Sequence, residues 1–345
     1  NLDADSGDVE LLAPTGTNSP YYAEFGWISL DKNLRLPNED TLWQAKGGDL
    51  TPQTPLLLEW NNGQGLKFIR KISLDDNYMF TIDQMVENNS GKEVTLYPYG
   101  LINRHYDTAN SSSSVVHEGM TGVMDGTLKE IKFKDLKDGQ KKDFKTNGGW
   151  AGFSDRYWFA ALILDNNQQS AVKFAKTGEQ TYQTDFVGQP VSIENGVVGN
   201  SSSRFFAGAK EIKLLDKYTK NLNITKFDLA VDFGWYYFLT KPFFYILDFL
   251  YNVIGNMGWA ILLFAALLRA AMFPVANKSY ESMSKMKKVQ PKIQELQLRY
   301  KDDRVKLQQE MMNLYRKEKI NPASGCLPML IQIPIFFSLY KVLNI

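Results

Sequence analysis

The sequence predicts a mixed fold, in which a large antiparallel β-sandwich domain precedes an α-helical membrane region that contains a helical hairpin. Three observations predict this fold. Short segments rich in aromatic and branched residues, separated by turn-forming residues, fill the first two thirds of the chain. A long apolar segment with one charge follows, and a basic segment of helical periodicity separates it from a second apolar segment.

The first domain, residues 1–233, has the pattern of a sandwich. Its segments alternate in polarity or are rich in residues that suit a half-buried pleated surface. No amphipathic helix separates them, which favours antiparallel strands over a parallel sheet covered by helices. One helix is expected over residues 208–218, where Ile212, Leu215 and Tyr218 share a face. We expect strands at 66–74, 78–86, 94–102, 157–164, 171–175 and 190–193.

This domain contains few side chains that perform catalysis or bind metals. It holds both histidines of the chain, His105 and His117, but no cysteine, glycine-rich phosphate loop or cluster with metal-ligand spacing. A saccharide or acid-base site at His105 is one interpretation. A polar loop histidine is preferred, because spacing assigns it no partner. The serine-rich runs 111–114 and 200–203 are expected to be flexible loops. We therefore expect no enzyme activity, no cofactor and no metal.

Residues 252–275 are expected to form a membrane-spanning helix with one charged residue, Arg269. At about 1.5 Å per residue this segment is long enough for a hydrocarbon core of about 30 Å. An arginine near the centre of such a helix costs roughly 2.5–3.5 kcal/mol, so it normally faces a bundle interior or a wet cavity. The alternative is that Arg269 only extends to the headgroups, since Val275 lies about 9 Å further along the helix axis.

The segment before this helix, residues 234–251, is crowded with aromatic residues. Aromatic rings prefer the headgroup level of a bilayer, so the segment is expected to form an amphipathic helix along the membrane surface. The alternative is that it extends the membrane helix.

Residues 276–324 are predicted to form a cytoplasmic helical hairpin. Positions 277–319 contain 12 Lys and Arg against 6 Asp and Glu, while residues 1–233 carry a net charge of −7. Short basic loops beside membrane helices stay in the cytoplasm, which places the first domain on the outer side. Pro291 is expected to kink or interrupt the first arm. The basic residues, among them Lys287, Lys288 and Arg304, are a topology signal, and could also attract anionic lipid, ribosomal RNA or acidic nascent chain.

The second apolar segment, residues 325–345, is predicted to return across the membrane. Gln332 is its notable polar residue and is expected at a depth similar to that of Arg269, where it could take part in function. The alternative is that Gln332 only forms a hydrogen bond to another helix. Pro328 and Pro334 are tolerable if neighbouring groups satisfy the freed carbonyls. Cys326, the one cysteine of the chain, is interpreted as a small buried hydrophobe.

Four runs of residues together resemble a known family. They are VDFGWYYFLTKP, GNMGWAILLFAALLRAAMFPV, SYESMSKMKKVQPKIQEL and QQEMMNLYRKEKINPASGCLPMLIQIPIFFSLY, to which GGWAGFSDRYWFAALI adds the first domain. In this order they resemble the YidC membrane protein insertases of Gram-negative bacteria, of the YidC/Oxa/Albino family. The resemblance covers nearly the whole chain.

The resemblance implies roles for particular residues. Arg269 matches the arginine of a hydrophilic groove that is open to cytoplasm and lipid. Gln332, Ile333 and Pro334 match the membrane helix along which substrate helices slide, and Phe336 is expected on the same lipid-facing path. Residues 277–319 match a mobile hairpin needed for activity. The first domain resembles a periplasmic β-supersandwich related to sugar mutarotase folds. The family's first and last three membrane helices are absent from this sequence, so we expect a fragment.

The expected function is that of an insertase and chaperone, which moves apolar segments of nascent proteins into the bacterial inner membrane without nucleotide hydrolysis. Nascent membrane proteins, the Sec translocon, the ribosome and membrane lipids are the expected partners, with no specific nucleic-acid sequence. We expect a multi-pass membrane protein whose large domain is periplasmic. The alternatives are a membrane-tethered carbohydrate-binding domain, which changes at His105 or Trp158 would impair, and a channel or transporter.

Overall fold

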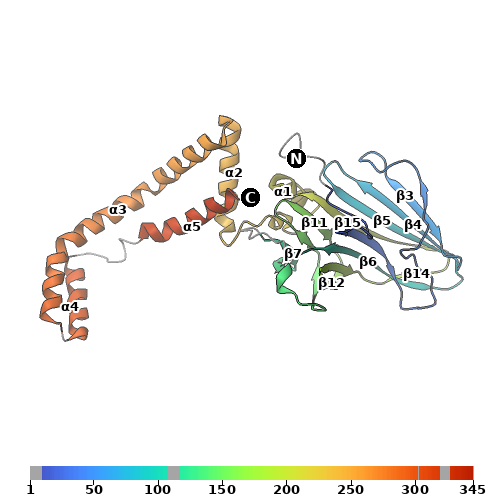
Figure 1. The fold of residues 1–345 in the computed structure, drawn as a ribbon, viewed down its shortest axis with the longest axis horizontal. Coiled ribbons are helices and arrows are strands. Elements are labelled where there is room, and N and C mark those ends of the chain that lie inside the picture. The colour runs from blue at the N-terminus through green and yellow to red at the C-terminus, as the bar shows by residue number, and fades with distance from the viewer. Residues whose placement is uncertain (1–9, 108–116, 302, 319–326, 345) are drawn as a thin grey trace. The chain divides into compact units, whose positions relative to one another are not determined.

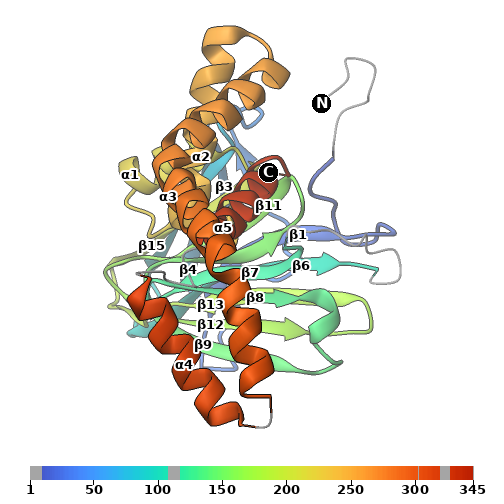
Figure 2. The same cartoon turned by 90° about the vertical axis from the view of Figure 1, so that its left-hand side faces the viewer.

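The computed structural model describes residues 10–107, 117–301, 303–318 and 327–344. The chain divides into two compact units, Asn1–Asp232 and Phe233–Ile345. The first unit contains the strands and the second contains four helices of the described residues (Figures 1 and 2). The mixed fold class is confirmed.

The smaller sheet of the first unit is antiparallel throughout its described strands. In spatial order its strands are β1 (Tyr21–Ile28), β6 (Val94–His105), β13 (Thr181–Val187), β12 (Gln169–Lys176) and β9 (Lys141–Asn147), with β14 (Val191–Ile193) also paired to β6. Because β6 is long, it pairs with β1 and β13 over most of its length and with β14 at its start.

The larger sheet is also antiparallel in the described residues. Its order is β2 (Gln44–Lys46), β3 (Leu56–Asn61), β4 (Leu66–Leu74), β5 (Met79–Asn88), β15 (Val198–Ala209), β11 (Trp158–Ile163), β10 (Trp150–Ser154), β7 (Gly119–Met124) and β8 (Thr127–Lys132). A tight turn joins β4 to β5, in which the Asp75 carboxylate accepts from the backbone N–H groups of Asn77 and Met79. Such turns permit neighbouring strands to run in opposite directions.

The main core lies between the two sheets. Alternating residues of each strand point inward, so both sheets contribute large apolar side chains. The smaller sheet contributes Phe25, Ile102, Phe174 and Tyr182, and the larger sheet contributes Met120, Phe153, Leu162 and Phe205. Burial of these side chains stabilises the sandwich, and the described residues contain no cysteine that could add a disulfide.

Two helical segments, α1 (Ile212–Asn221) and η3 (Phe227–Ala230), cover an aromatic cluster on the larger sheet. The ring of Phe227 contacts those of Trp150, Phe159 and Phe206, with centroid distances of 5.6–5.8 Å. The hydroxyl of Tyr218 on α1 donates to the Asp75 carboxylate at 2.6 Å. This hydrogen bond ties the helix to the β4–β5 turn.

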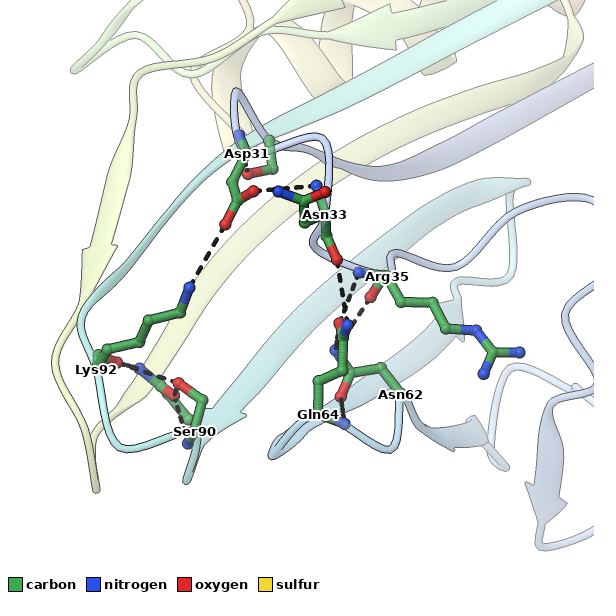
Figure 3. Close-up of polar contacts among 9 residues, drawn as sticks. Asp31, Asn33, Arg35, Asn62, Gln64, Ser90 and Lys92 are labelled. Atoms are coloured by element: carbon green, nitrogen blue, oxygen red, sulfur yellow. Dashed lines mark hydrogen bonds and ion pairs between the residues drawn. The ribbon is translucent and has the colours of Figure 1, made fainter.

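A polar network closes one end of the sandwich (Figure 3). The side chain of Gln64 accepts from the Arg35 backbone N–H at 2.8 Å and donates to the Asn33 carbonyl at 3.1 Å. The Asn62 amide donates to the Arg35 carbonyl at 3.0 Å, and the Lys92 ammonium lies 3.5 Å from the Asp31 carboxylate. These contacts hold the loop after β1 against the turn that contains Asn62 and Gln64 and the turn that contains Lys92.

Three predictions for this unit require correction. The helix expected over 208–218 begins at Ile212, because Gly208 and Ala209 still belong to β15. The run 200–203 is not a loop, since β15 carries it between β5 and β11. His105 is the last residue of β6 rather than a loop residue. The predicted loop at 111–114 lies outside the described residues.

The second unit begins with α2 (Tyr237–Ile254) and continues with α3 (Met257–Arg299). Gly255 ends α2 in the left-handed conformation with φ of 74°, and Asn256 caps α3 by accepting from the Trp259 N–H at 3.2 Å. The remaining helices are α4 (Arg304–Lys317) and α5 (Leu327–Val342). Within the described residues, α3 is long and apolar enough to cross a membrane, and α5 is a shorter apolar helix.

The helix boundaries differ from those predicted in two ways. The apolar helix starts at Met257 rather than at residue 252, because the Gly255–Asn256 pair separates it from α2. The predicted first arm of the hairpin is continuous with the predicted membrane helix, since α3 passes through Pro274 and Pro291 without ending. A proline removes one helical hydrogen bond but need not end a helix flanked by good helix formers. Figure 2 shows α4 beside the last part of α3.

Candidate functional site

Three helices of the second unit share a small apolar core. The buried side chains of Phe243, Leu247 and Leu250 on α2 meet Ala260 and Phe264 on α3, and Val342 on α5 joins them. The rings of Phe243 and Phe264 lie 5.0 Å apart, nearly perpendicular. This cluster fixes the first part of α3 and the last part of α5 against α2.

Arg269 lies on α3 just beyond this core. Leu268 is half-buried against the cluster, whereas Arg269 is exposed. Arg269 follows Met257 by twelve residues, about 18 Å along the helix axis, so it falls well inside an apolar span of about 30 Å. Among the described residues it forms no ion pair. The helix therefore presents an uncompensated cation within an apolar segment.

Gln332 occupies the corresponding place on α5. Ile335 and Leu339 are half-buried against the shared core, and Gln332 precedes Ile335 by one helical turn and is exposed. In Figure 1, α3 leads away from the core and α5 returns toward it. Arg269 comes five residues after Phe264 of the core on α3, and Gln332 comes three residues before Ile335 on α5. They stand on separate helices that contact one another.

The other α5 residues predicted for the site differ in exposure. Ile333 is 44% exposed and Phe336 is 60% exposed, so α5 presents large apolar side chains away from the core. Pro334 lies within the helix and is half-buried. The exposed side chains of α5 are therefore mostly apolar, and Gln332 is an isolated polar side chain among them.

The predicted hairpin residues lie on exposed helix surfaces. Lys287, Lys288 and Pro291 are exposed on α3, and Arg304 begins α4. An ion pair of 2.8 Å between Lys292 and Glu318 connects α3 to the end of α4. The hydrogen bond from this ammonium lowers the pKa of the Glu318 carboxyl. The two arms are thus held side by side by an exposed charge pair.

The described residues contain no group of three or more His, Cys, Asp or Glu side chains placed to hold a metal ion. His117 is buried, and its Nε2 lies 3.3 Å from the Met120 carbonyl oxygen. Its backbone N–H donates to the Asp232 carboxylate at 3.0 Å. These contacts give His117 a structural role at the start of β7.

The sandwich contains a cavity of about 570 Å³ near Trp158. It is lined by Leu11, Leu12, Asn77, Tyr78, Phe80, Trp158, Ala207, Gly208, Ala209, Glu211 and Leu214. His105 is not part of this lining, so the two residues considered for carbohydrate binding do not form one site. The lining is mostly apolar, with Asn77 and Glu211 as its polar side chains.

A half-buried ion pair between the sheets was not foreseen from the sequence. The Arg104 guanidinium lies 2.8 Å from the Asp155 carboxylate, and it covers the ring of Tyr21 at 4.6 Å. Burial raises the pKa of the Tyr21 hydroxyl. Nothing in the sequence indicated this pairing, because the partner of Arg104 is 51 residues away.

Two protein-family models together match nearly all of the chain. The YidC periplasmic domain matches residues 1–246, and the 60Kd inner membrane protein matches residues 249–345. The boundary between the matches lies within α2 and the residues near it. The first match therefore extends past Asp232, where the first unit ends, into α2 of the second unit.

Curated relatives match across the same length. A protein named Membrane protein insertase YidC from Beijerinckia indica is 50% identical, over 98% of this chain and 57% of its own length. The protein of the same name from Bradyrhizobium diazoefficiens is 48% identical, over 99% of this chain and 58% of its own length. The chain thus spans somewhat more than half the length of these relatives.

Among solved structures, a galactose mutarotase related enzyme from Lactobacillus acidophilus is similar to this chain only weakly. It is 11% identical over 49% of this chain and 71% of that chain, with a TM-score of 0.34. The family matches extend much further. With the YidC periplasmic domain matched over residues 1–246 and the inner membrane protein over the remainder, the chain belongs to the YidC family.

Proposed function

We propose that this chain is part of a membrane protein insertase and chaperone, which moves apolar segments of nascent proteins into the bacterial inner membrane through a hydrophilic groove containing Arg269. The observation that carries the proposal is an exposed, uncompensated arginine within the apolar part of α3. The insertase names of its relatives support it. The rest of the groove would come from parts of the full-length protein beyond this chain.

The cation would act on the polar tail that must cross the membrane. Attraction between unlike charges grows as the effective dielectric constant falls, so Arg269 would attract an acidic tail more strongly within the membrane than in bulk water. A wet groove that reaches partway into the lipid also shortens the apolar barrier for the tail. Gln332 on α5 would add amide contacts from the other side of the groove.

The apolar segment of the substrate would leave toward the lipid along α5. Ile333 and Phe336 are exposed large apolar side chains on this helix, which supports a sliding surface of this kind. Transfer of an apolar helix from water to lipid releases roughly 25 cal/mol per Å² of apolar surface. This free energy is sufficient to drive insertion, so the mechanism requires neither nucleotide hydrolysis nor a chemical step.

The hairpin would receive the nascent chain on the cytoplasmic side. The exposed Lys287, Lys288 and Arg304 support contacts with anionic lipid and with the ribosome, since basic groups at a membrane surface attract anionic partners. Cooperation with the Sec translocon belongs to the same proposal. The positive charge of this segment also supports an orientation of the chain in the membrane, with the hairpin in the cytoplasm and the sandwich in the periplasm.

Insertion into vesicles by the full-length protein tests the proposal. We expect Arg269→Ala to reduce insertion of a single-span substrate with an acidic outer tail by about tenfold or more, since a charged hydrogen bond contributes about 1.5–3 kcal/mol. Arg269→Lys should keep most of the insertion activity. For a substrate with a neutral outer tail, Arg269→Ala should reduce insertion less. Arg156→Ala, which removes an exposed guanidinium from the sandwich, is the matched control. Equal insertion by the wild type and both Arg269 variants would refute the groove mechanism.

A further inference from the structure

Two outermost strands of the sandwich follow one another in the chain. Among the described strands, β9 ends the smaller sheet and pairs only with β12, while β8 ends the larger sheet and pairs only with β7. The short helix η2 (Phe133–Asp135) lies between β8 and β9 in the chain, and β9 also contacts β7. An outermost strand has backbone N–H and C=O groups on one side that no other strand of its sheet satisfies.

This edge of the sandwich is basic although the domain is acidic. Residues 127–145, from β8 into β9, contain seven Lys against four Asp and Glu, whereas residues 1–233 carry a net charge of −7. The exposed lysines of this stretch form no ion pair within the part of the chain that the structure describes. They are Lys132, Lys134, Lys137, Lys141, Lys142 and Lys145. Their charges are therefore available to an acidic partner.

The outermost strands at the other ends of the two sheets are not basic. β1 carries Glu24 and no lysine, and the single lysine of β2, Lys46, forms an ion pair of 2.7 Å with Glu59 of β3. Lysines on an outermost strand commonly prevent pairing with other proteins. That protection would be needed equally at β1 and β2, so it does not explain why the lysines gather at β8 and β9.

The outer face of β9 combines positive charge with an open strand edge. Lys141, Asp143 and Lys145 share this face, because Phe144 between them packs against the main core and side chains alternate along a strand. On β12, Asp143 already has Lys173 opposite it, whereas the two lysines of β9 have alanines opposite them. Opposite charges on directly paired residues stabilise a strand pair. A strand added beside β9 is therefore most stable with carboxylates opposite Lys141 and Lys145.

We infer that β9 binds the acidic outer tail of a substrate as an added strand, through backbone hydrogen bonds and the ammonium groups of Lys141 and Lys145. This inference rests on the proposed insertase function and names a second contact for the tail, on the sandwich. Backbone hydrogen bonds suit a tail of any sequence, and the lysines select acidic ones. A membrane helix pairs its own backbone groups, so further helices of the full-length protein do not compete for this edge.

A labelled peptide of about ten residues that alternates Glu and Thr tests the inference on the full-length protein in neutral detergent. Fluorescence anisotropy measures its dissociation constant. We expect Lys141→Gln combined with Lys145→Gln to raise this constant by about 2- to 30-fold, the range of two cross-strand charge pairs. Lys32→Gln combined with Lys71→Gln is the matched control, because these lysines are exposed elsewhere on the sandwich, and it should bind like the wild type. Equal affinities for the two double variants would overturn the inference.

Methylation of the peptide backbone distinguishes an added strand from a purely ionic contact. Successive N–H groups of a strand point to opposite edges, so N-methyl groups on alternate residues block one edge and leave the other open. One peptide is methylated at its Glu residues and a second at its Thr residues. We expect one of them to lose about tenfold or more in affinity and the other to bind like the unmethylated peptide. Equal affinities for the two methylated peptides would overturn the strand addition.

Arg269→Ala, measured with the same peptide, separates this site from the groove, because Arg269 belongs to the other unit. It should leave the affinity for the peptide unchanged, and a loss of affinity would overturn the inference by placing the peptide in the groove. If the Arg269 variants behave as proposed in vesicles while peptide binding is independent of Lys141 and Lys145, only the inference about β9 is wrong.

Discussion

Arg104 and Asp155 form an ion pair that joins the two sheets of the sandwich. Arg104 belongs to β6 of the smaller sheet, and Asp155 follows β10 of the larger sheet, with 2.8 Å between guanidinium and carboxylate. The rings of Tyr21 and Tyr106 lie 4.6 and 5.2 Å from the guanidinium carbon. Aromatic faces and one carboxylate thus compensate a cation at the end of the core.

Removal of one partner of this pair should destabilise the sandwich. We expect Asp155→Leu to lower the free energy of unfolding by about 3 kcal/mol, because it leaves Arg104 mostly buried without its counter-charge. The double change Arg104→Met with Asp155→Leu should recover most of this loss, since two apolar side chains remove the unpaired charge. Denaturant unfolding followed by tryptophan fluorescence measures both. A double variant as unstable as the single one would contradict this explanation.

His117 should make the stability of the sandwich depend on pH. Burial lowers the pKa of its imidazole below the ordinary value of about 6.5. The hydrogen bond to the Met120 carbonyl and the charge of Asp232 oppose this shift, while Lys210 and Lys132 add to it. The unfolded chain therefore binds a proton before the folded one does. The stabilising contribution is complete above a pH of about 6.5 and is lost as the pH falls toward the folded pKa.

The measurement for His117 is the thermal midpoint of the sandwich between pH 7.5 and 5.5. The wild type should lose more stability than His117→Gln over this interval, because glutamine does not titrate. The difference between the two proteins isolates the histidine from the other titrating groups. Parallel pH curves would show that His117 is protonated equally in both states.

Gly152 should not tolerate a side chain. A Cβ atom at this position of β10 would lie 1.9 Å from the Ala160 carbonyl oxygen of the neighbouring strand, which requires backbone movement. We expect Gly152→Ala to destabilise the unit by about 1–3 kcal/mol, the usual range for overpacking. Gly48→Ala is the control, since no atom lies within 4 Å of its added Cβ. Equal unfolding midpoints for the two variants would contradict the steric argument.

The strands that the sequence predicted best are those with strong local signals. The segment 66–74 is confirmed residue for residue as β4, because alternating polarity lies between a glycine turn and an aspartate turn. The run 200–203 was missed, since Asn and Ser have low strand propensity. Pairing of β15 with strands on both sides, at positions far away in sequence, outweighs that propensity.

In the second unit, too, the features with a local sequence signal could be predicted, and the others could not. Arg269 was visible as a candidate because one charge in an apolar run stands out in any sequence. The end of α2 could have been found from Gly255 and Asn256, which form a helix stop followed by a cap. The continuity of α3 through two prolines could not have been predicted, because a proline inside a helical segment normally indicates a break or a kink.

If Arg269 works as proposed, the polar tail of a substrate meets its guanidinium inside the membrane. The direct measurement places a photoreactive residue in the outer tail of a stalled single-span substrate and maps its crosslinks on the full-length wild-type protein by mass spectrometry. We expect crosslinks to α3 near Arg269 and to α5 near Gln332. Crosslinks confined to the hairpin or the sandwich, with none on these two helices, would contradict it.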